Sequence, residues 1–169
     1  AVVAGADQDY GIYFGNSTQN NNIGGTAASN GNVISGNSAR GIWLNGTGTS
    51  YNFIRANIIG PQRDGITYLA SNSQDYGIYA DGNAEDNYIG GSVAGTTNTI
   101  SGNSDGGAGG GTGILLAPSI SALVNGVYGN IIGLASNGTA LLASLPAAAS
   151  RQHYGVVLSS SLDDTIGGT

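Results

Sequence analysis

The chain of 169 residues carries a formal net charge of −6, and its four cations are all arginine, with no lysine and no cysteine. So few cations leave no basic surface of the kind that binds nucleic acid or anionic membranes. No run of about 20 apolar residues is present, so the sequence predicts no membrane insertion. Its 31 glycines would favour disorder if they were unpatterned, but hydrophobic residues make up 40% of the chain and recur at a regular period. The composition therefore favours a folded domain.

A repeating unit is clearest at residues 74–103, QDYGIYADGNAEDNYIGGSVAGTTNTISGN. It contains three short runs that alternate apolar with polar or small residues, which is the period of a half-buried strand. Each run is bounded by Gly, Asn, Asp or Ser, the residues that favour turns. One unit therefore predicts three short strands joined by three turns.

The three strands recur in the same order along the chain. The first carries a Gly-Ile or Gly-Val pair, at Gly11-Ile12, Gly41-Ile42, Gly77-Ile78, Gly113-Ile114 and Gly155-Val156. The second is centred on Ile23, Ile54, Ile89, Val127 and Ile166, and the third on Ile34, Ile59, Ile100 and Ile132. First strands follow one another at steps of 30 to 42 residues, which is typical of a solenoid. We expect an all-β solenoid of about five coils.

A longer period covers two coils. The string QDYGIY occurs at residues 8–13 and again at 74–79. In one type of coil a loop follows the second strand, at residues 26–31 and 92–97. In the other type a longer loop follows the third strand, at 61–76 and 134–154. Loops are therefore expected to emerge from different corners on alternate coils.

Both ends of the chain fall inside the repeat. The first residues align with a long loop, and the last, Ile166 to Thr169, match the middle of a coil at Ile23 to Thr26. Free solenoids need polar capping repeats, and neither end resembles one. Residues 1–169 are expected to be one domain, either a slice of a longer array or a subunit that stacks end to end.

The strings Gly-Ile-x-Leu, Asn-x-Ile-Gly-Gly and Asn-x-Ile-Ser-Gly-Asn resemble the repeat of right-handed, pectate-lyase-like parallel β-helix proteins. The resemblance covers the whole chain and is closest to arrays in large bacterial secreted and surface proteins. It implies a right-handed parallel β-helix at an extracellular or cell-surface location, and the acidic, lysine-free composition is typical of extracellular prokaryotic proteins. The family includes lyases, hydrolases, epimerases, adhesins and tailspikes, so the fold does not decide the function.

Asparagine falls two residues before the central apolar residue of the second and third strands. At a rung spacing of ~4.8 Å, side-chain amides can donate and accept along such a column. The predicted structural ladders are Asn21, Asn52, Asn87 and Asn125, and Asn32, Asn57, Asn98 and Asn130. Asp164 takes the fifth place in the first ladder, which should weaken there because a carboxylate cannot donate.

The middle residues of the first strands should form an outward column, because their neighbours are expected to point inward. The column is Tyr13, Trp43, Tyr79, Leu115 and Val157, and Tyr10, Tyr76 and Tyr154 precede the same strands on alternate coils. One interpretation is a cross-strand ladder covered by the long loops. The other is a platform for a sugar ring or a neighbouring protein, with Tyr13, Trp43, Tyr79, Tyr10 and Tyr76 as candidate binding residues.

Catalytic signals are weak. The single histidine, His153, is expected in a loop as a solvated residue, and no Ser, His and Asp share a recurrent triad spacing. Polysaccharide lyases that share the resemblance use clustered calcium-binding carboxylates and a basic residue. The acidic cluster of Asp81, Glu85 and Asp86, with Asp163 and Asp164 two coils on, matches no calcium loop and has no aligned cation. We expect no cofactor or metal, with a weak surface Ca²⁺ site as the alternative. The glycine-rich run 105–113 is expected to be a flexible loop.

Two functional hypotheses remain. The first is a non-catalytic extracellular module, such as a stalk, an adhesin segment or a filament subunit, whose partner is another copy, a longer chain or a cell-surface molecule. The second is a carbohydrate-active or carbohydrate-binding domain of the lyase, hydrolase or epimerase kind, whose partner is a polysaccharide.

Overall fold

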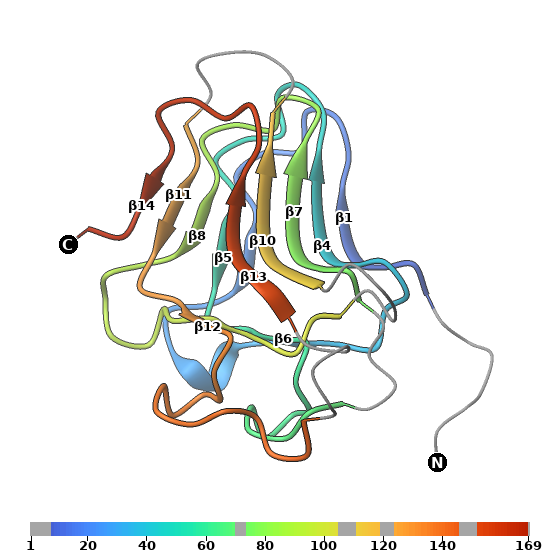
Figure 1. Cartoon of the computed structure of the whole chain (residues 1–169). Coiled ribbons are helices and arrows are strands. Elements are labelled where there is room, and N and C mark those ends of the chain that lie inside the picture. The colour runs from blue at the N-terminus through green and yellow to red at the C-terminus, as the bar shows by residue number, and fades with distance from the viewer. Residues whose placement is uncertain (1–7, 70–73, 105–110, 119–123, 146–151, 169) are drawn as a thin grey trace.

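The computed structural model describes residues 8–69, 74–104, 111–118, 124–145 and 152–168 (Figure 1). They form fourteen strands and one 3₁₀ turn, η1 (Ala28–Asn30), and contain no α-helix. One sheet holds β1 (Tyr10–Phe14), β4 (Arg40–Asn45), β7 (Tyr76–Asp81), β10 (Gly111–Ala117) and β13 (Gln152–Leu158). A second holds β2 (Asn22–Gly24), β5 (Phe53–Arg55), β8 (Tyr88–Gly90), β11 (Gly126–Tyr128) and β14 (Thr165–Ile166). The third holds β3 (Val33–Ile34), β6 (Ile58–Ile59), β9 (Thr99–Ile100) and β12 (Ile131–Ile132).

Every strand pairing in the three sheets is parallel, and each sheet takes one strand from each successive group of three. Parallel neighbours need a long connection, and here the connection is the rest of the coil. The all-β, parallel, repeating architecture predicted from the sequence is therefore confirmed. The three strand series keep the predicted register, for example Ile54 opposite Ile89 and Ile59 opposite Ile100.

Apolar columns between the sheets form the core. The fully buried members are Ile42, Leu44, Ile54, Ile59, Ile78, Ile89, Ile100, Ile114 and Leu116. Ile23, Ile54, Ile89, Val127 and Ile166 lie in one column, as predicted. Ile166 is 46% exposed because it belongs to the last coil, where no described coil covers it.

The first strand of each coil departs from strict alternation at its glycine. A Cβ on Gly41 would lie 2.6 Å from the Gly77 carbonyl oxygen and 3.0 Å from Ile59 Cγ2, so Gly41 faces the interior. Ile42 is also completely buried, so two consecutive residues face inward. Arg40 and Trp43 consequently lie on the same outer face although they are three residues apart, which simple alternation does not predict.

Loops of the same type meet across the intervening coil. In the long loops, the Tyr68 amide donates to the Ala143 carbonyl at 2.9 Å, and Tyr68, Ala135 and Leu142 form a small separate apolar cluster. These loops lie side by side at the bottom of Figure 1, in green and orange. In the shorter loops, a Cβ on Gly95 would lie 2.8 Å from the Thr26 carbonyl oxygen. The two-coil period of the sequence therefore corresponds to contacts between loops that lie two coils apart.

Two expectations about loops are wrong. His153 lies within β13 rather than in a loop, and its side chain is exposed. Gly111–Gly113 belongs to β10, because Thr112 and Ile114 pair with Tyr76 and Ile78 of β7. The rest of the glycine-rich run, 105–110, lies outside the described residues.

Candidate functional site

Two asparagine columns connect the coils through their side chains. In the first, each Nδ2 donates to Oδ1 of the next coil at 3.0 to 3.3 Å, through Asn21, Asn52, Asn87 and Asn125. In the second the distances are 2.8 to 3.1 Å, through Asn32, Asn57, Asn98 and Asn130. The same amides also donate to backbone carbonyls of the preceding coil, as Asn98 does to Ile54 at 2.7 Å. The arrangement satisfies buried polar groups and gives these residues a structural role.

A third polar ladder was not predicted. It alternates glutamine with asparagine at the corner before each first strand, with donor–acceptor distances of 2.6 to 2.9 Å. Its members are Gln8, Asn37, Gln74, Asn103 and Gln152. The sequence did contain the signal, because the glutamines begin the QDYGIY-type strings and the asparagines end the ISGN strings.

The first asparagine ladder ends at Asp164. Its Oδ1 accepts a hydrogen bond of 2.6 Å from the Asn125 backbone N–H, and its Oδ2 is buried without a partner. Burial raises the pKa of Asp164, while the hydrogen bonds from Asn125 act in the opposite direction. An asparagine at this position would have a single side-chain oxygen, which could accept the hydrogen bond from Asn125. The second, unpartnered oxygen is therefore a consequence of the carboxylate.

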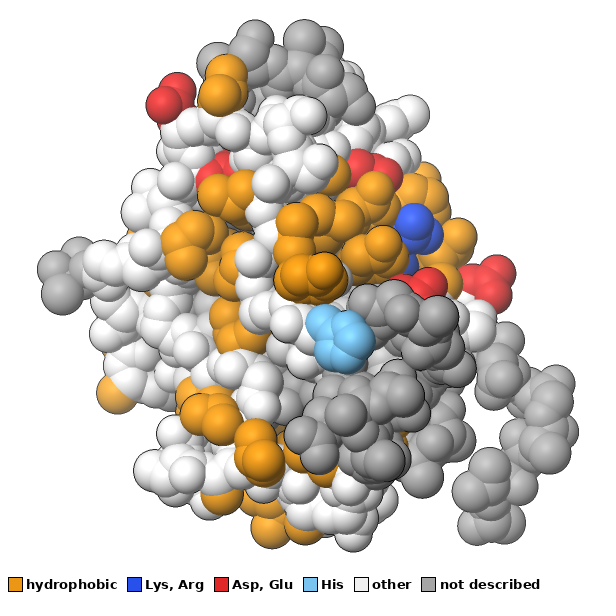
Figure 2. Space-filling view, viewed as in Figure 1, with side chains coloured by type: hydrophobic (Ala, Val, Ile, Leu, Met, Phe, Trp, Pro, Cys, Tyr) orange, Lys and Arg blue, Asp and Glu red, His pale blue; other side chains and the backbone are white. Residues whose placement is uncertain are grey.

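The outward column lies where the sequence predicted it, on the sheet of β1, β4 and β7. Tyr13, Trp43 and Tyr79 are in register, and the Tyr13 and Trp43 ring centroids are 4.9 Å apart. Tyr10 also lies 4.9 Å from Trp43, and Tyr76 stacks on Tyr79 at 5.0 Å. Figure 2 shows hydrophobic side chains gathered over this sheet, with a basic side chain among them. Tyr13 is 53% exposed, so the described loops do not cover this end of the column.

Arg40 lies at the centre of this aromatic face and was missed in the sequence. Its Cζ is 4.3 Å from the Trp43 centroid and 4.6 Å from that of Tyr79, with Tyr10 and Tyr76 within 5.9 Å. Arg40 is in register with Tyr10 and Tyr76 on the neighbouring strands. Aligning the sequences of successive coils would therefore have placed Arg40 beside these two tyrosines. The Arg40 Nε is buried without a hydrogen-bond partner, and the guanidinium lies against four aromatic rings.

Asp81 borders the same face. Its Oδ1 accepts hydrogen bonds from Trp43 Nε1 at 2.8 Å and from Asn45 Nδ2 at 2.6 Å. Burial and the nearby Asp81 carboxylate raise the pKa of Tyr79, and Arg40 partly offsets this. Asp81 is thus engaged by two donors on the aromatic face.

Asp86, another acid of the predicted cluster, contacts a tyrosine instead. A hydrogen bond from Tyr51 to Asp86 raises the pKa of that exposed tyrosine. Among the described residues, no three His, Cys, Asp or Glu side chains are arranged to hold a metal ion. His153 makes an edge contact with Tyr154 at 6.5 Å.

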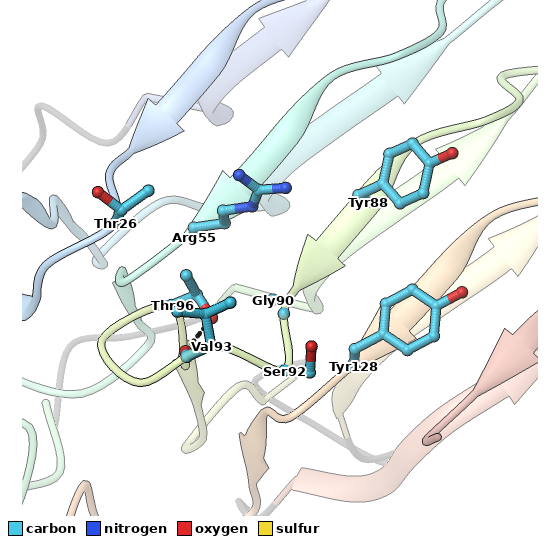
Figure 3. A pocket seen from close by; sticks show the side chains of 9 residues that line it. Thr26, Arg55, Tyr88, Gly90, Ser92, Val93, Thr96 and Tyr128 are labelled. Carbon is cyan, nitrogen blue, oxygen red and sulfur yellow. Dashed lines mark hydrogen bonds between the residues drawn. The ribbon is translucent and has the colours of Figure 1, made fainter. Parts of the chain in front are cut away.

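A pocket of about 390 Å³ lies on the second sheet, apart from the aromatic face (Figure 3). Arg55 of β5, Tyr88 and Gly90 of β8 and Tyr128 of β11 line it, together with the loop that follows β8. Arg55 Cζ lies 4.2 Å from the Phe53 centroid, and Phe53 stacks on Tyr88 at 5.1 Å. Thr26, which follows β2, also lines the pocket, so the lining comes from four coils and no sequence pattern indicated it.

The described part of the chain includes no helix of the length and hydrophobicity needed to span a membrane. No protein family matches this sequence, and no curated protein or solved structure matches it either. Any functional conclusion therefore depends on the geometry of the ladders, the aromatic face and the pocket.

Proposed function

We propose that this chain is a non-catalytic structural module of an extracellular or cell-surface protein, a right-handed parallel β-helix that serves as a stalk, an adhesin segment or a filament subunit. The observation that carries this proposal is the set of three side-chain amide ladders that join successive coils alongside the apolar columns. The right-handed winding is expected because parallel crossings are almost always right-handed.

The ladders suit a protein under tension because their hydrogen bonds run along the axis of the stack. In a solenoid the strands of each coil stack on those of its neighbours, so stability is roughly a sum of coil and interface terms, to which the loop contacts across one coil add here. Extending the stack therefore adds length without weakening any coil. A rigid element of adjustable length is what a stalk or a filament requires.

The last described coil offers a surface for further stacking. Leu158 and Ile166 are 50% and 46% exposed, whereas their column neighbours Leu116 and Val127 are at most 3% exposed. An open strand edge beside exposed apolar side chains is a template for another strand. We propose that a further coil covers this surface, from the same polypeptide or from a second copy.

The test combines assembly with activity. At high concentration, light scattering should show self-association that Ile166→Asp abolishes, and fibre diffraction of the assembly should retain the ~4.8 Å strand spacing. A wild-type chain that stays monomeric would contradict stacking between copies. Release of unsaturated or reducing ends from a panel of polysaccharides would contradict the non-catalytic role.

The alternative function, carbohydrate binding, is favoured by one observation. The rings of Tyr10, Tyr13 and Trp43 lie within 6.2 Å of one another, and Tyr13 is half exposed. Aromatic faces of this kind can stack on sugar rings. Binding to a glycan array that Tyr13→Ala abolishes, while Tyr154→Ala preserves it, would support this function.

A further inference from the structure

The pocket on the second sheet is produced by a missing side chain in the middle of a row. Gly90 is in register with Tyr128, and the pairing of Ile54 with Ile89 places Arg55 on the other side of Gly90. At ~4.8 Å per strand, the backbones that carry Arg55 and Tyr128 are roughly 10 Å apart. Gly90 has no side chain to fill the space between these two side chains, and its buried backbone lines the pocket.

Glycine is required at the base of this gap. Gly90 has φ +83°, and a Cβ there would lie 2.0 Å from the Tyr128 carbonyl oxygen. No other residue fits this position without a shift of the backbone. The gap is thus a fixed feature of the coil.

Both sides of the pocket are held in place before any ligand binds. Tyr88 stacks nearly parallel on Phe53, with 13° between the rings, and the Tyr128 ring lies over Gly126. On the loop side, Thr96 Oγ1 donates to the Val93 carbonyl at 2.6 Å, and the Thr96 amide donates to the same oxygen at 3.1 Å. Figure 3 shows Arg55, Tyr88 and Tyr128 projecting from neighbouring strands on one face. A preformed site loses little conformational entropy when a ligand binds.

Arg55 gives the pocket its chemistry. It is the one charged residue among the described residues that line the pocket, and its Nε is buried without a hydrogen-bond partner. Stacking on Phe53 holds the guanidinium in place but satisfies none of its N–H donors. Because the Nε itself is enclosed, a carboxylate in the pocket would meet the terminal Nη donors of the guanidinium, whose planar edge matches a carboxylate.

We propose that this pocket binds a carboxylate attached to a six-membered ring. The carboxylate accepts hydrogen bonds from Arg55, and the ring lies over Gly90 between Arg55 and Tyr128, with the hydroxyl of Ser92 at the rim. A volume of about 390 Å³ lies within the usual range for small-ligand sites and exceeds what one such ring needs. The ring can be a sugar or an aromatic ring, since both present a flat apolar face to tyrosine.

The test is an NMR titration of the ¹⁵N-labelled chain with four probes: glucuronate, benzoate, glucose and benzyl alcohol. At least one carboxylate should shift the Gly90 and Gly91 amides and the Arg55 Nε–H saturably, with a dissociation constant in the millimolar range. The neutral ring of the same kind should shift them far less. Glucuronate alone would identify a sugar acid, and benzoate alone would identify an aryl acid.

Arg55→Gln should weaken carboxylate binding by about tenfold or more, while Arg63→Gln, at an exposed loop position, should not change it. Ser92→Phe is the second variant, because it fills the pocket from an exposed position and leaves the core untouched. Equal affinity in the wild type, Arg55→Gln and Ser92→Phe would overturn the proposal. The absence of saturable shifts up to about 50 mM of either carboxylate would overturn it as well.

Discussion

The side-chain amide of Asn37 donates a hydrogen bond of 2.7 Å to Oε1 of Gln74, and neither side chain is more than 1% exposed. Gln74 in turn donates to Asn103 at 2.6 Å, so one residue completes two buried contacts. Replacing Gln74 with an apolar residue therefore breaks the hydrogen bonds of both Asn37 and Asn103.

Gln74→Leu should therefore lower the free energy of unfolding by about 2–4 kcal/mol, because it leaves a buried donor on Asn37 and a buried acceptor on Asn103. Gln8→Leu makes the same change at the exposed end of the ladder and should cost less than about 1 kcal/mol. Urea denaturation measures both. Equal losses in the two variants would show that the ladder does not contribute to stability.

Ile89→Asp should prevent folding, because Ile89 is fully buried between two covered coils. An unpaired carboxylate there costs several kcal/mol, whereas the free energy of unfolding of a domain is only roughly 5–15 kcal/mol. The control is Ile166→Asp, which lies in the same column but is half exposed. Circular dichroism should show strand structure for the control alone. A folded Ile89→Asp variant with wild-type melting would contradict the packing described above.

Gly41→Ala should destabilise the fold by about 1–3 kcal/mol, because the added methyl group meets the Gly77 carbonyl at 2.6 Å in a buried position. Gly155 occupies the equivalent site in the last described coil, where the nearest contact of a Cβ is Ile132 Cγ2 at 3.5 Å. Gly155→Ala should therefore change stability by less than about 1 kcal/mol. Thermal unfolding of the two variants measures this difference. Similar losses of stability in both would mean that the lost backbone flexibility, and not crowding of the added methyl group, causes the destabilisation.

Asp164→Asn should stabilise the protein at neutral pH by about 1 kcal/mol, since it removes a partly buried negative charge whose Oδ2 lacks a hydrogen-bond partner. Burial raises the pKa of Asp164, so the folded state binds its proton more tightly than the unfolded state. The stabilising contribution is then present at low pH and is lost as pH rises through the folded-state pKa. The advantage of Asp164→Asn should accordingly shrink at about pH 3.

The measurement is denaturant unfolding at both pH values, with Asp9→Asn, at an exposed position near the other end of the chain, as the control. An advantage of Asp164→Asn that is the same at acid and neutral pH would indicate that protonation of Asp164 plays no part.

Arg40→Met should remove the cation–π contacts with Trp43 and Tyr79 while keeping the aliphatic stem, at a cost of about 1–2 kcal/mol. The chain has a single tryptophan, so its fluorescence reports this face directly. Arg63→Met, at an exposed position, should leave both stability and emission unchanged. Unaltered emission in Arg40→Met would contradict the placement of the guanidinium over the Trp43 ring.

The interior was predictable from the sequence and much of the exterior was not. Ile54 and Asn52 could be assigned because hydrophobic and amide residues repeat at matching places in every coil. Arg40 could not be placed on the aromatic face, because the two consecutive inward residues at Gly41 and Ile42 result from close packing between coils. The pocket beside Gly90 depends on which residues of adjacent coils are in register, and spacers of variable length obscure that in a linear sequence.

The alternation of glutamine and asparagine has a consequence for how such arrays change length. Gln74 precedes its first strand by two residues and Asn37 precedes its own by three, so the longer and shorter side chains compensate for different backbone positions. The paired loops, joined through Tyr68 and Ala143, likewise skip one coil. Duplication or deletion of a single coil would place two glutamines or two asparagines next to each other in the ladder and would separate the paired loops. Duplication or deletion of two coils would preserve the alternation and the loop pairing. We therefore expect that chains built on this plan gain or lose coils in pairs.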